Sequence, residues 1–236
     1  MPNSFLSDSA TRSLAQSHGP VQQGSLVCAS STLGLALQVT AAFILLEAVL
    51  WTGLSTANAV ALILTTVCVF SFVLAGPFTR QQMGLGRPQF RASLWVLASG
   101  AILAASIALL SSLVGGDLPP THAVPLRGAW IYAIWALVQQ FLLQSFFFVR
   151  FEALLGARRA VLAAALLFAA AHIPNPILTV LSLGGGLFFC EMFRRYRNIY
   201  ALGLAHAMLG LTVAASFSDP LLHRMRVGIG YLLFHA

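Results

Sequence analysis

Residues 57–76, ANAVALILTTVCVFSFVLAG, form an apolar run without one charged side chain. A helix needs about 20 such residues to cross the hydrocarbon core of a bilayer, so this run predicts a transmembrane helix. Other runs of the same kind stand on both sides of it, and one of them, at 160–173, is short. They cover residues 33–52, 92–114, 128–149, 160–173, 176–193 and 199–215.

The composition of the whole chain also indicates a membrane protein. Of 236 residues, 58% are hydrophobic and 8% are charged, whereas soluble domains carry about 25% charged residues. These values exclude a soluble enzyme, a disordered chain and a nucleic-acid-binding protein. Cys28, Cys68 and Cys190 are too few and too far apart for a disulfide framework or a zinc site. We therefore expect an all-α, polytopic membrane bundle of about 7–8 transmembrane helices.

The two ends of the chain differ from this core. Residues 1–26 are polar, rich in Ser and Gln, and lack the apolar segment of a signal peptide, which predicts a disordered cytoplasmic tail. Residues 220–236 are apolar but carry His223 and two arginines, so a thin eighth span and an interfacial helix stay open there. The expected organisation is a tail at 1–26, N-terminal spans at 27–127 and a membrane core at 128–236.

The arginines predict the orientation of the spans. All 13 basic residues are arginine, and clusters of them follow the second, fourth and sixth runs. With the N-terminus inside, ten of the 13 lie in the cytoplasm, which is the positive-inside pattern. The net charge of +7 therefore reflects topology. We expect a multi-pass protein of a bacterial inner (cytoplasmic) membrane with a cytoplasmic N-terminus.

Few polar side chains stand inside the apolar runs, and each is costly in lipid unless it has a partner or a function. They are Glu47, Gln139, Gln140, Gln144, His172, Glu191 and His206. Gln140 and Gln144 are four residues apart and share a helix face. Hydrogen bonding between helices is the simplest role for the glutamines, and a bond to a backbone carbonyl is the simplest role for each histidine.

The order of these polar groups is more informative than any one of them. Three segments read QQFLLQSFFFVR at 139–150, LLFAAAH at 166–172 and LGLAHAMLG at 202–210. Over roughly residues 128–215 this order resembles the CAAX prenyl protease and bacteriocin-processing (CPBP) family of intramembrane proteases. That family carries a Glu-Glu pair with Arg four residues after the second Glu, then Phe-x-x-x-His, then His-x-x-x-Asn or Asp. Phe168 and His172 match the second motif, and His206 matches the start of the third.

The remaining motif positions depart from the family. Gln139 and Gln140 stand at the Glu pair, Gln144 at the Arg, and Gly210 at the final Asn or Asp. The resemblance implies that the first Glu and the histidines activate water, and that the third-motif pair binds the oxyanion. A glutamine does not accept a proton near neutral pH, which removes an effect of about 10²–10⁴ in rate. Gly210 removes a side-chain donor worth about 10²–10³.

Three sources of a replacement base stay open. They are Glu47, Glu191, and His172 itself with Gln139 or Gln140 positioning the water. The arginines that follow Glu191 favour a salt bridge for that residue. No cofactor and no metal are expected, since two histidines without a carboxylate make a poor zinc site.

Three functions follow from these alternatives. The first is an intramembrane endopeptidase with a diverged site, acting on membrane-embedded or lipidated peptides. The second is a pseudoprotease that serves as a membrane scaffold or immunity factor. The third is a small transporter with Glu47 as its titrating group. The lipid bilayer is a partner in all three, and nucleic acid in none.

Overall fold

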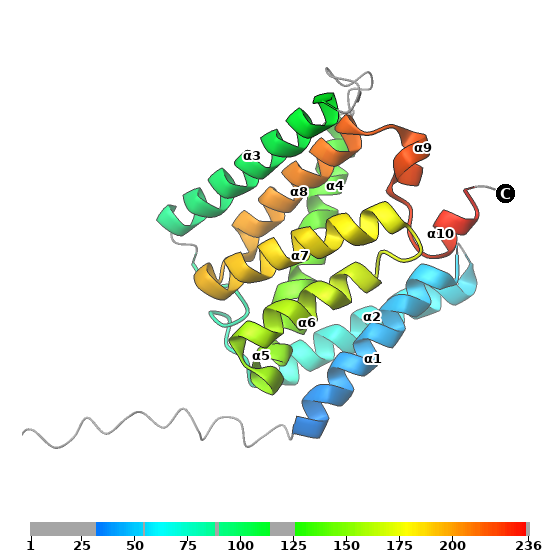
Figure 1. Cartoon of the computed structure of the whole chain (residues 1–236). Helices are drawn as coiled ribbons and strands as arrows, with labels where there is room; N and C mark the ends of the chain where they lie inside the picture. Colours follow the sequence, from blue (N-terminus) through cyan, green and yellow to red (C-terminus); the bar gives the residue numbers. More distant parts are fainter. Residues whose placement is uncertain (1–31, 54, 88–89, 114–125, 235–236) are drawn as a thin grey trace, which may run out of the picture.

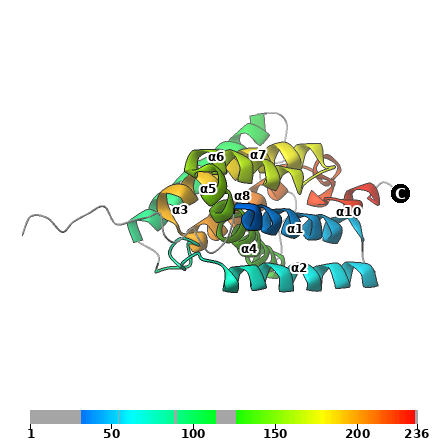
Figure 2. The same cartoon turned by 90° about the horizontal axis from the view of Figure 1, so that it is seen from below.

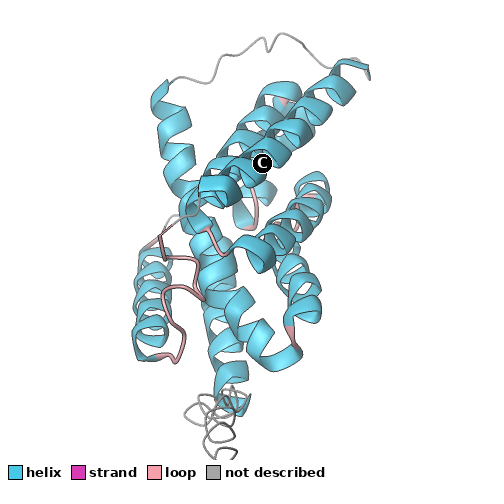
Figure 3. Cartoon of the chain, turned by 90° about the vertical axis from the view of Figure 1, so that its left-hand side faces the viewer, coloured by secondary structure: helices cyan, strands magenta, loops and turns pink. Residues whose placement is uncertain are grey.

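The computed structural model describes residues 32–53, 55–87, 90–113 and 126–234, and within them it contains helices and loops but no strand (Figures 1 and 3). The expected all-α fold is confirmed. The predicted tail at 1–26 and Cys28 lie outside the described residues. The helices are α1 (Thr32–Trp51), α2 (Thr56–Ala75), α3 (Phe90–Leu113), α4 (Leu126–Gln140), the π-helix η2 (Phe141–Phe148), α5 (Val149–Leu155), α6 (Ala157–Ala170), α7 (Pro176–Tyr196), α8 (Ile199–Ser216), α9 (Asp219–Leu222), the 3₁₀ turn η3 (His223–Met225) and α10 (Ile229–Leu232).

Six stretches of the described chain are helical, long and apolar enough to cross a membrane, which makes this a multi-pass membrane protein. They are α1, α2, α3, the continuous stretch Leu126–Leu155, α7 and α8. The short span predicted at 160–173 corresponds to α6, which has 14 residues. Each of the seven predicted spans therefore corresponds to a helical stretch, but α6 is not among the six that could cross a membrane.

The C-terminal segment is neither of the two alternatives expected for residues 220–236. It is divided into three pieces of at most four residues each. The backbone takes positive φ angles at His223, Arg224 and Met225 and again at Gly228. Such angles are incompatible with a right-handed helix, so no single helix runs through this segment.

The helices pack in neighbouring pairs. α6 packs on α7, α8 packs against both α3 and α4, and α1 packs on α2. Seen from below in Figure 2, α6 and α7 form one side of the molecule and α2 the opposite side, with α1 between them. α8 is buried along most of its length, since eleven of its 18 residues are buried.

Small residues set the distance between α6 and α7. A Cβ atom on Gly186 would lie 3.0 Å from the Cα of Ala165, so the two backbones touch there. Such small-residue contacts are typical of membrane helices. Gly186 is therefore a packing residue, whereas a Cβ on Gly184 would meet nothing within 4 Å.

One end of the bundle gathers the arginines. Arg150 is fully buried and donates to the Phe72 and Phe146 carbonyl oxygens at 3.0 Å and to Gln38 Oε1 at 2.9 Å. Arg197, which caps α7, donates to Glu152 and to the carbonyl oxygen of Gln82. These contacts join α1, α2, the loop after α2, α5 and the end of α7, at the lower left of Figure 1. We call this region, with Arg150, Arg194, Arg195 and Arg197, the arginine-rich end.

Candidate functional site

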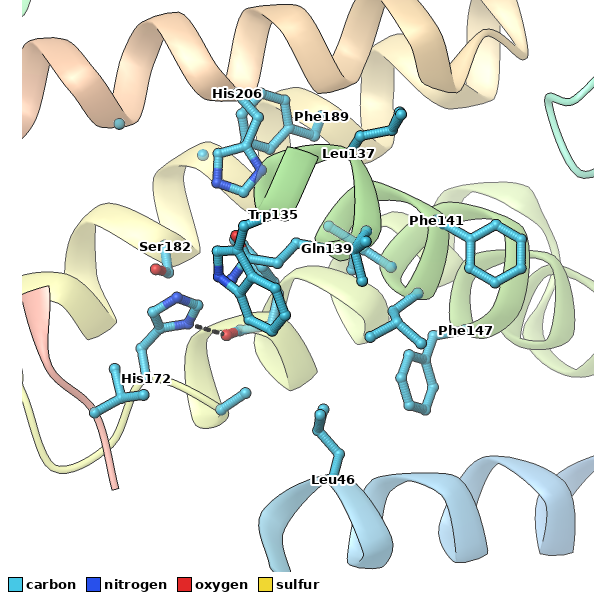
Figure 4. A pocket seen from close by; sticks show the side chains of 18 of the residues that line it. Leu46, Trp135, Leu137, Gln139, Phe141, Phe147, His172, Ser182, Phe189 and His206 are labelled. Atoms are coloured by element: carbon cyan, nitrogen blue, oxygen red, sulfur yellow. Dashed lines mark hydrogen bonds between the residues drawn. The ribbon is translucent and has the colours of Figure 1, made fainter. Parts of the chain in front are cut away.

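A cavity of about 880 Å³ lies between α1, α2, α3, α4, η2, α6, α7 and α8 (Figure 4). Its walls are mainly Leu, Val, Phe and Gly. Among the described residues that line it there is no Asp, Glu, Lys or Arg. Its polar lining comes from Thr65, Thr66, Tyr132, Gln139, His172, Ser182, Tyr200 and His206.

His172 enters the cavity from the end of α6. Its Nδ1 lies 2.7 Å from the carbonyl oxygen of Phe168, and its ring lies 4.8 Å from the Phe168 ring. The Phe168 oxygen is available because the His172 N–H bonds to Ala169 instead, as the last turn of the helix tightens. A carbonyl only accepts, so Nδ1 carries the proton and Nε2 keeps a free lone pair. The Phe-x-x-x-His spacing thus fixes the tautomer of His172.

His206 enters the same cavity from α8 and is held in the opposite tautomer. Its Nδ1 lies 3.1 Å from Gln140 Nε2, and the Gln140 Oε1 accepts from Gln144 Nε2 at 3.2 Å. An amide nitrogen only donates, so Nδ1 accepts and Nε2 carries the proton. One imidazole therefore offers a lone pair and the other an N–H.

The two adjacent glutamines have different surroundings. Gln139 lines the cavity, whereas Gln140 is fully buried behind it. The π-helix η2 begins at the residue after Gln140, and π segments are frequent at functional sites. Gln144 also reaches Cys190 Sγ at 3.7 Å. Gln140 and Gln144 thus form a neutral hydrogen-bonded pair that continues to His206, whereas Gln139 faces the cavity.

Tyr132 of α4 was not found from the sequence. A Cβ atom on Gly210 would lie 1.8 Å from the Tyr132 Oη and 2.5 Å from its Cζ. The phenol therefore occupies the space that a side chain at position 210 would fill. The sequence does not predict the contact between Tyr132 and Gly210, because the two residues are far apart in the chain and a single tyrosine in an apolar run is not part of a motif.

The structure does not bring Glu47 or Glu191 to the histidines. Glu47 Oε2 accepts from Trp51 Nε1 at 3.0 Å, and Glu47 is not among the residues of the cavity wall. Glu191 bonds to Arg194 and Arg195 at the arginine-rich end. No group of three or more His, Cys, Asp or Glu lies together within the described part of the chain. Among the sequence-derived residues, the cavity wall holds Gln139, Phe168, His172, His206 and Gly210.

Comparison with known families identifies the region that carries this site. Residues 121–212 match the family model described as type II CAAX prenyl endopeptidase Rce1-like. Searches of curated proteins and of solved structures gave no match. The matched region contains every residue of the three motifs, and the resemblance inferred from them is confirmed.

Proposed function

From the match of residues 121–212 to the Rce1-like family model of CAAX prenyl endopeptidases, we propose that the chain is an intramembrane endopeptidase whose base is His172. One observation carries the proposal. His172 and His206 come from different helices, face one apolar cavity and are held in opposite tautomers by Phe168 and Gln140. A base and a hydrogen-bond donor are thereby available without a charged residue.

The proposed reaction is hydrolysis of a peptide bond. His172 Nε2 accepts a proton from water as the water oxygen bonds to the peptide carbonyl carbon, and the Gln139 amide orients that water. The His206 N–H donates to the carbonyl oxygen as it becomes negative. The proton on His172 then passes to the leaving amine as the C–N bond breaks. A histidine suits this exchange because its unperturbed pKa lies near neutrality.

The wall of the cavity supports a membrane-embedded or lipidated peptide as substrate. Its lining is apolar over most of its extent and uncharged among the described residues. An acyl or prenyl chain, or a transmembrane segment, would be better solvated there than a polar peptide. Glu47 and Glu191 remain less supported bases, because neither lines the cavity.

We also propose that the arginine-rich end faces the cytoplasm of a bacterial inner membrane. The segments that hold its arginines meet at one end of the bundle, as the positive-inside rule requires. His172 stands just past the far end of α6 from Arg158, roughly 20 Å along the helix axis. Cysteines placed at Arg158 and at Leu113 should react with a membrane-impermeant thiol reagent from opposite sides.

A pseudoprotease is the second candidate. It is favoured by the cavity wall, where no described residue is a carboxylate, and by amides in place of the charged motif. Such a protein would hold a membrane peptide without cleaving it, as a scaffold or immunity factor. No contact favours the transporter alternative, since Glu47 stands outside the cavity wall.

Mass spectrometry of membrane-associated peptides tests the proposal without a guess at the substrate. Native cells would carry wild type, His172→Ala, His206→Ala, or His223→Ala as the same substitution outside the cavity. We expect peptides that form only with wild type and His223→Ala. Identical peptide profiles for all four, at equal amounts of inserted protein, would reject hydrolysis and favour the pseudoprotease.

A further inference from the structure

We infer that the Tyr132 hydroxyl is a second oxyanion donor, which takes the place of the side chain that Gly210 lacks. The inference rests on the proposed hydrolysis and identifies a further residue of the same site. It concerns the one motif position at which this chain has no functional group of its own.

The position of the phenol supports this role. Its Oη lies 1.8 Å from where a Gly210 Cβ would be, which is inside the volume of a side chain at that position. Any larger residue at 210 would collide with the ring, since Cζ and Cε1 are also within 2.7 Å of that point. The position of Tyr132 therefore requires glycine at 210, which leaves room for the phenol.

The Tyr132 hydroxyl lies next to His206 at the cavity. Gly210 stands one helical turn after His206, so a group in its side-chain position lies beside that imidazole. The Tyr132 ring is perpendicular to the His206 ring, with centroids 6.5 Å apart, and both residues line the cavity. Within the described part of the chain the hydroxyl forms no hydrogen bond, so its proton is available to a ligand in the cavity.

The chemistry needs only hydrogen bonding from the phenol. As water adds to the peptide carbonyl, the oxygen gains negative charge and accepts from Tyr132 O–H and from His206 Nε2–H. No proton leaves the tyrosine, and the bonds strengthen as the charge develops. A preorganised donor of this kind contributes about 10²–10³ in rate.

The test uses full-length protein in proteoliposomes and two probes. The first is a quenched-fluorescence peptide that spans the cleavage site of the membrane substrate whose product forms only with wild type. We expect Tyr132→Phe to lower kcat about 100-fold with KM unchanged, whereas Tyr231→Phe, the same change outside the cavity, leaves kcat unaltered. Because phenylalanine keeps the ring, its melting temperature should match that of wild type. Wild-type kcat for Tyr132→Phe would overturn the inference and leave the proposed hydrolysis standing.

The second probe is a phosphonamidate analogue of an apolar Leu-Ala peptide, which carries a tetrahedral anionic centre. Wild type should bind it more tightly than the matching amide, and Tyr132→Phe should lose about tenfold of that preference. This measurement does not depend on turnover, so it decides the role of the donor even if no hydrolysis is found. Equal preference in the two proteins would overturn the inference.

A double variant separates donation from packing. Tyr132→Ala vacates the space, and Tyr132→Ala with Gly210→Asn returns an amide donor from α8. We expect the double variant to recover at least tenfold in anion preference over Tyr132→Ala. Failure to recover, with both proteins folded, would show that the phenol acts through packing alone.

Discussion

The arginine-rich end and the histidine cavity accommodate buried polar groups in different ways. At the arginine-rich end, the fully buried Arg150 is surrounded by carbonyl oxygens and by the Phe146 ring, 3.8 Å from its guanidinium carbon. At the cavity, Gln140 behind the wall bonds to both His206 and Gln144, and no described residue of the wall is charged.

This difference predicts separate roles for the two regions, one in stability and the other in chemistry. The charged contacts join α1, α2, α5 and α7, so they should determine how stably the bundle holds together. The neutral contacts fix the orientation of the His206 imidazole, so they should determine chemistry and contribute little to stability. The predictions below compare matched substitutions in the two regions.

Arg150→Leu should have the largest effect, a loss of about 3 kcal/mol in unfolding free energy. Two acceptors, the Phe72 oxygen and Gln38 Oε1, would lose their buried donor at about 1–3 kcal/mol each, and the contact with the Phe146 ring would be lost as well. Unfolding in detergent micelles measures this. Arg158→Leu is the control, because Arg158 is exposed. Equal stability of the two variants would contradict a structural role for the arginine-rich end.

The same Gln→Glu change should destabilise the protein at the histidine cavity but not at the arginine-rich end. Gln140→Glu puts a carboxyl at a fully buried position and removes the donor to His206, which should cost about 2 kcal/mol. Gln38→Glu gives Arg150 a charged acceptor and should be neutral or stabilising by up to about 1 kcal/mol. Thermal unfolding of the two variants under one condition compares them directly. Destabilisation by both would remove the distinction between the regions.

Glu152→Gln should cost about 1 kcal/mol, and the cost should fall in 1 M salt. Glu152 accepts from Arg197 at 2.6 Å, and the Arg197 guanidinium also lies over the rings of Phe148 and Phe193. Glu191→Gln is the control, since its partners Arg194 and Arg195 are more exposed and such pairs contribute about 0–1 kcal/mol. A larger effect of Glu191→Gln would contradict this ranking.

Local patterns in the sequence predicted the helices closely. The run 57–76 corresponds to α2 at Thr56–Ala75, and the run 199–215 to α8 at Ile199–Ser216. Length and polarity determine a membrane span, and both can be read from adjacent residues. The order of the motifs likewise predicted one site for His172 and His206, because it reflects which helices face each other. Both histidines do line one cavity.

Contacts between distant residues were not predictable in the same way. In the sequence Arg150 directly follows the fourth apolar run, but the helix continues to Leu155 and the arginine is buried. Its partners Gln38 and Phe72 are 112 and 78 residues away. Tyr132 was missed for the same reason, since its relation to Gly210 exists only in the folded bundle.

Gln144→Met should have the smallest effect on stability, within about 0.5 kcal/mol, while lowering the rate of hydrolysis several-fold. Gln144 donates to Gln140 Oε1, but its own Oε1 is buried and has no partner among the described residues. Losing one hydrogen bond costs about 1 kcal/mol, and removing an unsatisfied buried acceptor returns a similar amount. Without this anchor the Gln140 amide can rotate and offer oxygen to His206, which would reverse the tautomer and withdraw the N–H from the cavity.

Ser145→Ala is the matched control for Gln144→Met. Ser145 is its buried neighbour and donates to the Met83 carbonyl oxygen at 2.6 Å, outside the amide network. It should lose about 1 kcal/mol of stability and keep the wild-type rate, which is the reverse pattern. Unfolding in micelles and peptide turnover, measured on the same preparations, distinguish the two. If Gln144→Met unfolds as easily as Arg150→Leu, the amides stabilise the bundle as much as the arginines do. The prediction of separate roles for the two regions would then be wrong.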